Sequence, residues 1–125
     1  MSTLAKKKSD QYRRVEAKYP VIFLTAEGPI QGETQCITTN TAFVCCSEPL
    51  RIYDRATFSI EISQRESLHA EGEVVWSNIH GPDDEVTPRG MIVRFTRLSA
   101  QNRARLHKVI KGHYTRKLHA ISGKS

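Results

Sequence analysis

The residues best suited to binding chemistry lie in a basic stretch near the N-terminus, where Arg13, Arg14 and Lys18 precede an apolar run that begins at Val21. Cationic side chains of this kind attract phosphates or an acidic protein surface. An ordinary basic lead-in to a β-strand has the same composition, so both interpretations stay open on these residues alone.

A second candidate is the polar segment 36–44, in which Cys36, Thr38, Asn40 and Thr41 lead into an apolar run. Asn and Thr are frequent in turns because their short side chains hydrogen-bond to nearby backbone groups. The segment predicts a tight turn at the entrance to a strand, and a turn without any binding role is the alternative interpretation.

Signatures of catalysis are absent from the sequence. It contains no GxSxG, no HExxH and no glycine-rich phosphate loop. Paired carboxylates for acid–base chemistry would have to come from the acidic run at residues 83–85, which lies in a polar loop and is better explained as a solubilising feature. We therefore expect a protein that is not an enzyme.

The cysteines and histidines do not indicate a metal site. Cys45 and Cys46 are adjacent, and adjacent residues of a strand point to opposite faces of the sheet. His107, His113 and His119 are spaced by six residues, which spreads them around a helix instead of clustering them. We expect structural cysteines, no metal and no cofactor.

The size and composition fit one globular domain. The chain has 125 residues, of which 38% are hydrophobic and 26% charged. No run of about 18 uncharged apolar residues is present, so we expect no membrane insertion. The first ten residues lack the apolar run of a secretory signal, and three cysteines do not make a disulfide framework. These features predict a cytoplasmic protein.

The basic charge is concentrated at the two ends of the chain. Residues 1–20 carry a net charge of +4, and residues 99–125 carry +7 without a single acid. Residues 21–98 hold six Arg against eleven acids, a net charge of −5. Such ends would attract an anionic partner, and a pair of solvated tails is the alternative.

Apolar runs predict short strands at about residues 21–24, 41–46, 56–62, 68–76 and 91–95, and the polar, β-tolerant segment 30–38 brings the number to six. Several of the runs alternate with a period of two, which is typical of half-buried strands. Gly72 indicates a β-bulge. Trp76 continues the apolar positions of its strand and is expected in the core, with a ligand platform as the alternative. Arg94 is expected to face outward, either as a surface charge or as a ligand contact.

After Leu98 the apolar period becomes that of a helix, with Ser99 as a candidate N-cap. Gly112 costs about 1 kcal/mol relative to alanine, so the helix either continues or breaks there. Short antiparallel strands followed by one helix predict a mainly β barrel or sandwich. We expect residues 1–11 to be a disordered basic arm, residues 12–121 the domain and residues 122–125 a tail.

The two candidate segments and this order of elements resemble the PilZ domain family over about residues 12–115. The family pattern RxxxR is matched by Arg14 and Lys18, and the pattern (D/N)xSxxG by Cys36, Thr38 and Thr41. Its Val-x-Trp strand end and its closing strand correspond to residues 74–76 and 90–95. The resemblance implies a six-stranded antiparallel β-barrel with a C-terminal α-helix.

For function, the resemblance implies binding of cyclic di-GMP, a bacterial second messenger with two guanines and two phosphates. An arginine can place its fork on guanine O6 and N7 or on a phosphate. A basic segment that orders over the barrel on binding would present a changed surface to an unidentified partner protein. The ligand-binding residues would be Arg13, Arg14, Lys18, Cys36, Thr38 and Thr41.

The binding pattern departs from that of the family. Lys18 keeps the charge of the second arginine but lacks its planar fork, Cys36 is a weak acceptor, and Thr41 adds a Cβ where the family has glycine. Thr38 in place of serine is the mildest change. Losing two bidentate contacts at about 1–3 kcal/mol each would move a micromolar affinity toward the millimolar range or abolish it.

Three hypotheses about function follow. The first is a cyclic di-GMP receptor that signals to a protein partner, and the alternative is a degenerate PilZ domain that acts only as a protein-interaction adaptor. A nucleic-acid binder that uses the C-terminal cations is the third hypothesis. It rests on charge alone, because Tyr114 is the one aromatic residue in segment 99–125 that could stack on a base.

Overall fold

The computed structural model describes residues 14–122 of the chain. The expected basic arm at residues 1–11, the candidate ligand residue Arg13 and residues 123–125 of the expected tail lie outside the described residues.

The described chain contains seven strands followed by one helix. The elements are β1 (Val15–Glu16), β2 (Pro20–Thr25), β3 (Gly28–Ile37), β4 (Thr41–Cys45), β5 (Arg55–Glu61), β6 (Ser67–Asn78), β7 (Gly90–Arg97) and α2 (Ala100–Ser122). All six strands that the sequence predicts are present, as is the terminal helix.

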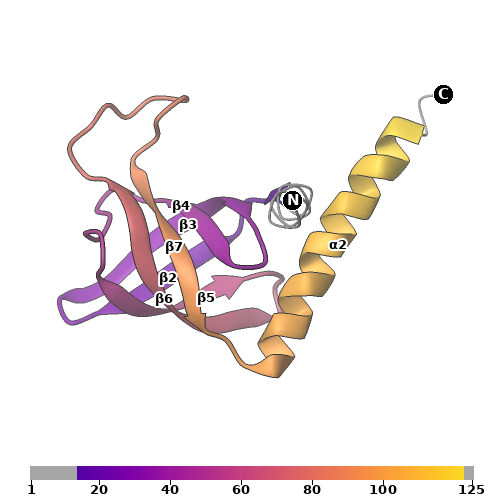
Figure 1. Ribbon diagram of the computed structural model, residues 1–125, viewed down its shortest axis with the longest axis horizontal. Coiled ribbons are helices and arrows are strands. Elements are labelled where there is room, and N and C mark those ends of the chain that lie inside the picture. The colour runs from indigo at the N-terminus through magenta and orange to yellow at the C-terminus, as the bar shows by residue number, and fades with distance from the viewer. Residues whose placement is uncertain (1–13, 123–125) are drawn as a thin grey trace, which may run out of the picture.

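Strands β2 to β7 close into an antiparallel barrel (Figure 1). The hydrogen-bonded order is β3, β2, β5, β6, β7, β4, and β4 pairs back with β3 to close the ring. This confirms the predicted six-stranded barrel with a C-terminal helix. The short strand β1 is an addition that pairs with the end of β3.

The barrel interior is filled by the alternate apolar residues of its strands. Phe23 and Phe58 lie on paired strands with ring centroids 5.0 Å apart, and Phe95 extends this aromatic group at 5.8 Å from Phe58. Gly72 faces the same group, and a Cβ there would lie 2.4 Å from a methyl carbon of Val93. The sheet register shifts at Gly72, as the sequence predicts for a bulge.

Trp76 lies on the outside of the barrel, so its expected place in the core is wrong. A second register shift in β6, between Val74 and Trp76, makes Val75 an extra residue. Val74 remains buried, but Trp76 is shifted to the outward side opposite Ile92. Arg94 faces outward as predicted and forms an ion pair with Glu73 at 2.9 Å.

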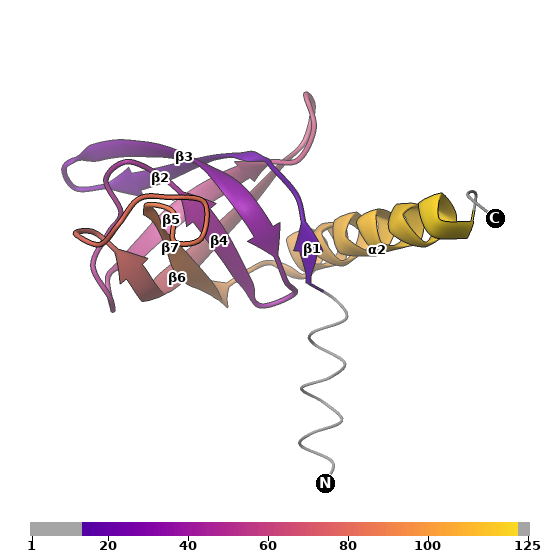
Figure 2. The same cartoon turned by 90° about the horizontal axis from the view of Figure 1, so that it is seen from above.

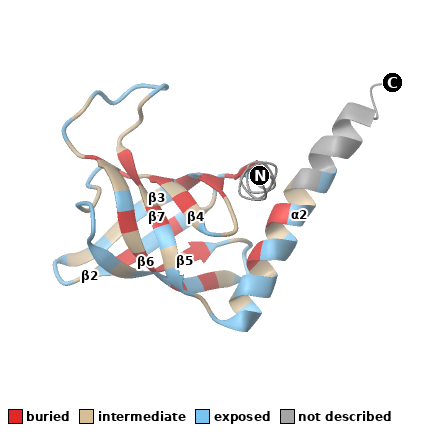
Figure 3. Ribbon diagram, in the orientation of Figure 1, coloured by how far each residue is buried: buried red, intermediate tan, exposed pale blue. Residues whose placement is uncertain are grey.

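Helix α2 packs its first half against the barrel and then extends past it (Figures 1 and 2). The helix contacts β1 and β6, and among its described side chains Leu106 and Ile110 are buried; Figure 3 colours the ribbon by burial. The Ser99 hydroxyl accepts a hydrogen bond from the N–H of Asn102 at 3.1 Å, which confirms the N-cap. The helix continues through Gly112 without a break.

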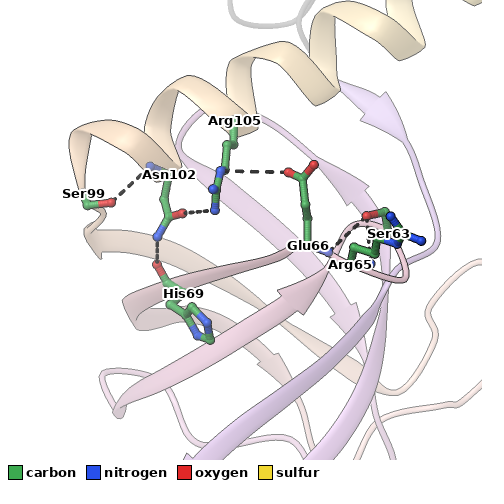
Figure 4. Close-up of polar contacts among 7 residues, drawn as sticks. All are labelled: Ser63, Arg65, Glu66, His69, Ser99, Asn102 and Arg105. Atoms are coloured by element: carbon green, nitrogen blue, oxygen red, sulfur yellow. Dashed lines mark hydrogen bonds and ion pairs between the residues drawn. The ribbon is translucent and has the colours of Figure 1, made fainter.

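Polar contacts fix the base of α2 on β6 (Figure 4). The side-chain amide of Asn102 donates to the carbonyl oxygen of His69 at 3.1 Å. Arg105 reaches Glu66, which precedes β6, at 3.9 Å. These contacts set the direction in which the helix leaves the barrel.

Candidate functional site

The N-terminal segment lies along β3 and presents its charges outward. In β1, Val15 pairs with Ile37 and Glu16 with Cys36. Val15 and Ala17 are buried, so the alternating residues Arg14, Glu16 and Lys18 face away from the core and are exposed. Arg14 therefore lies beside the end of β3, next to Thr38.

Thr34 holds the backbone between β1 and β2. Its side chain is 1% exposed. Its hydroxyl donates to the carbonyl oxygen of Ala17 at 2.6 Å and accepts from the N–H of Tyr19 at 2.8 Å. The N–H of Thr34 also donates to the carbonyl oxygen of Tyr19 at 2.8 Å. The two ends of the segment that carries Lys18 are thus fixed to the barrel wall.

Thr38 and Thr41 close the tight turn between β3 and β4. The N–H groups of Asn40 and Thr41 donate to the Thr38 hydroxyl at 3.1 and 2.9 Å, and the two threonine hydroxyls are 2.9 Å apart. The turn predicted from the sequence is therefore present. Its hydroxyl groups are already engaged within the turn.

Cys36 lies on the outward side of β3, opposite Glu16 on one side and Phe43 on the other. It is only 8% exposed, because neighbouring side chains cover it. A thiol at this position offers a weak acceptor, and little of its surface is accessible to a ligand.

Burial and neighbouring charges hold the other two thiols in their protonated form at neutral pH. Burial raises the pKa of the Cys45 thiol, Glu33 adds to the increase, and the charge of Lys18 opposes it. Burial raises the pKa of Cys46 to about 11. All three cysteines are free, and among the side chains that the structure describes no group of three or more His, Cys, Asp or Glu could hold a metal ion.

An apolar row crosses the outside of the barrel beside the Thr38–Thr41 turn. Cross-strand pairing aligns Cys36 with Phe43, Phe43 with Ile92, and Ile92 with Trp76. The rings of Phe43 and Trp76 are 5.7 Å apart and inclined by 43°. Half-buried aromatic rings at a barrel surface offer a platform on which a purine base can stack.

A polar row runs next to the apolar one. Thr41 pairs with Arg94, and Arg94 pairs with Glu73. Glu73 also forms an ion pair with Arg55 at 3.7 Å, so its carboxylate pairs with two guanidinium groups. We call the two rows, the Thr38–Thr41 turn and residues 14–18 together the outer binding face.

The structure thus brings together five of the six candidate ligand residues, namely Arg14, Lys18, Cys36, Thr38 and Thr41, on one face. The contributions of Phe43, Ile92 and Arg94 to this face were not predicted as a group. They come from strands that are distant in sequence, and only the cross-strand register reveals them.

A family model, the PilZ domain, matches residues 9–112. The chain belongs to the PilZ family. The comparison with curated proteins gave no match. Among the described residues no helix is long and apolar enough to cross a membrane.

Solved structures of PilZ proteins share the fold. The PilZ domain of YcgR from Escherichia coli with c-di-GMP is 14% identical, with a TM-score of 0.64 over 90% of this chain and 95% of that one. The inhibitor of motility MotI/DgrA from Bacillus subtilis is 16% identical, with a TM-score of 0.67 over 85% of this chain. Only 49% of the MotI/DgrA chain is covered, so this chain spans about half its length.

Proposed function

We propose that this PilZ domain binds cyclic di-GMP on the outer binding face and passes the signal to a partner protein without catalysis. The observation that carries the proposal is that Arg14 and Lys18 are both exposed on the same face, with Arg14 beside the Thr38–Thr41 turn. Within residues 14–122, no acidic side chain forms an ion pair with either cation. Both charges are therefore available to the phosphates of a ligand.

The aromatic platform supports the same ligand. Phe43 lies on β4, which continues from the turn, and its ring lies 5.7 Å from that of Trp76 on β6, so a ligand held at its phosphates by Arg14 could rest a guanine against them. Membership of a family that binds cyclic di-GMP supports this assignment, as does the solved YcgR complex with c-di-GMP, which has the same fold.

The relay would run through the segment that carries the cations. Tyr19 follows Lys18, and its hydroxyl lies 2.5 Å from Nε2 of His113 on α2. A ligand that draws residues 14–18 toward the barrel would also act on this contact with the helix. The exposed side of α2 would then be the surface whose position changes for the partner.

A second candidate function is that of an adaptor that has lost the ligand. Two observations favour it: Cys36 is nearly buried, and the Thr38 and Thr41 hydroxyls bind each other. In this case the barrel would serve as a protein-interaction module without a second messenger.

Isothermal titration calorimetry with cyclic di-GMP separates the two functions. We expect the wild type to bind, Arg14→Ala to weaken binding at least tenfold, about 1.4 kcal/mol, and Lys18→Arg to tighten it. Arg65→Ala, which removes an exposed arginine from the loop between β5 and β6, is the matched control and should bind as the wild type.

The variant Lys18→Arg/Cys36→Asp/Thr41→Gly restores the family pattern. Binding by this variant alone would support the adaptor, and absence of binding by every protein would overturn the ligand assignment. Because Cys36→Asp places a carboxylate at a nearly buried position, circular dichroism melts must first show that the restored variant is folded. Position 18 is exposed, so Lys18→Arg tests whether a restored arginine improves binding without the risk of unfolding the domain.

A further inference from the structure

A shallow groove of about 630 Å³ lies beside Trp76, where β6 leads into the loop toward β7. Ile52, Trp76, Ile79 and Pro82 supply apolar surface, and Arg51 and His80 are the ionisable side chains of the lining. No acidic residue is among the described residues that line it. The groove therefore combines an aromatic wall with a cation at its edge.

The wall of the groove is held in place before any partner binds. Asn78 is 5% exposed, and its side-chain amide donates to the carbonyl oxygens of Pro82, Thr87 and Pro88 at 2.8, 3.2 and 3.2 Å. Its side-chain oxygen accepts from the N–H of Gly81 at 2.9 Å. One buried side chain thus organises the loop around the groove, which lowers the entropy lost on binding.

An exposed apolar rim continues the groove. Tyr53 is 79% exposed and has a φ angle of 77°, in the left-handed region that residues other than glycine seldom adopt. Its N–H donates to the carbonyl oxygen of Val74 at 2.8 Å, which places the turn against β6. Ile52 and Val75, next in sequence to Tyr53 and Val74, are 46% and 41% exposed.

We propose that this groove and its rim form a docking site for a protein segment that places an apolar side chain against Trp76 and a carboxylate beside Arg51. Tryptophan, tyrosine and arginine are the residues that contribute most to protein–protein binding energy. The lining offers a cation without an acid, so it complements a segment with a negative charge. The site shares Trp76 with the outer binding face but has its own cation, Arg51, so the Arg51 test below separates it from the proposed cyclic di-GMP site.

A nucleotide suits this groove less well. The loop that forms one side of it carries the exposed acids Asp83, Asp84 and Glu85. These acids would repel a phosphate chain, with its several charges, more strongly than the single charge of a carboxylate at Arg51.

Nuclear magnetic resonance with two small probes tests the site on the full chain. N-acetylphenylalanine at pH 7 has an aromatic ring and a carboxylate, and N-acetylphenylalaninamide has the same ring without the charge. Trp76 is the one tryptophan of the sequence, so its indole N–H gives a single signal. We expect the carboxylate probe to shift this signal and those of residues 79–81 with millimolar affinity, and the amide probe to bind at least threefold more weakly.

In Arg51→Ala the carboxylate probe should bind no more tightly than the amide probe. In the control Arg65→Ala the carboxylate probe should still bind more tightly. Both arginines are exposed, so neither change threatens the fold. The proposal is overturned if neither probe shifts these signals, if both bind equally to the wild type, or if the carboxylate probe still binds more tightly in Arg51→Ala. Stronger binding of guanosine monophosphate that shifts the signals of residues 79–81 and is lost in Arg51→Ala would assign the groove to a nucleotide instead.

Discussion

Thr34 illustrates how one hydroxyl can position a binding segment. It joins the carbonyl oxygen of Ala17 and the N–H of Tyr19 to the wall of the barrel. Thr34→Val removes this link and leaves both backbone groups without that partner, so we expect the free energy of unfolding to fall by about 1–3 kcal/mol.

Urea denaturation measures the effect of this change. Thr34→Ser keeps the hydroxyl and should lose less stability than Thr34→Val. Equal stability of the valine variant and the wild type would show that the hydroxyl does not hold the segment.

Cys46 makes the free energy of unfolding depend on pH in the alkaline range. Its thiol has a pKa of about 11 in the folded chain, against an ordinary value of 9.0. Between these two pH values the unfolded chain loses this proton first, so stability falls as the pH rises.

Comparison with Cys46→Ala isolates this contribution. The stability advantage of the wild type over the alanine variant should shrink by about 1–2 kcal/mol between pH 8.5 and pH 11, after allowance for solvent screening. Denaturation curves at several pH values provide the measurement. An advantage that stays constant over this range would contradict the raised pKa.

At the scale of the elements, Tyr19 and His113 join the binding segment to α2. Their polar atoms are 2.5 Å apart, and the rings meet edge to face with centroids 5.8 Å apart. A double-mutant cycle with Tyr19→Phe and His113→Phe should give a coupling energy of about 0.5–1.5 kcal/mol. The cycle cancels the other contacts of each residue.

Tyr53→Phe, an exposed tyrosine near the groove, is the control for this cycle and should show no coupling to His113→Phe. Unfolding free energies of the single and double variants supply the values. A coupling energy near zero for Tyr19 and His113 would show that this contact does not transmit ligand binding to α2.

The strands of the barrel could be predicted because their inward residues recur on alternate positions, as in β5. The two-residue strand β1 could not, because it exists only through its pairing with β3. The continuity of α2 at Gly112 also depends on tertiary contacts: Leu106 and Ile110 anchor the preceding turns, and His113 contacts Tyr19. These contacts outweigh the poor helix propensity of glycine.

The candidate site was predicted in part. Motif spacing and family resemblance placed Arg14, Lys18 and Thr38 together, but not Phe43 and Trp76. The outward position of Trp76 results from a bulge next to Val75, and sequence alternation alone assigned it to the core. The role of Thr34 was missed because a threonine inside a strand has no distinguishing pattern.

At the scale of the whole molecule, the acids and the cations of the helix are separated. The barrel and its loops, residues 20–98, carry eleven of the twelve acids among residues 14–122, whereas the exposed side of α2 carries Arg103, Lys108 and Lys111. The outer binding face and the groove meet at Trp76, which stacks near Phe43 and also lines the groove. A ligand on one surface could therefore influence a partner on the other through this one side chain.

The central claim is that cyclic di-GMP binds on the face where residues 14–18 lie along β3 and Arg14 lies beside the Thr38–Thr41 turn. The most direct measurement is a titration of the isotope-labelled chain with cyclic di-GMP, followed by amide chemical shifts. We predict saturable shifts concentrated in residues 14–19 and 38–43. Unchanged spectra at a large excess of ligand, or shifts confined to α2, would contradict it.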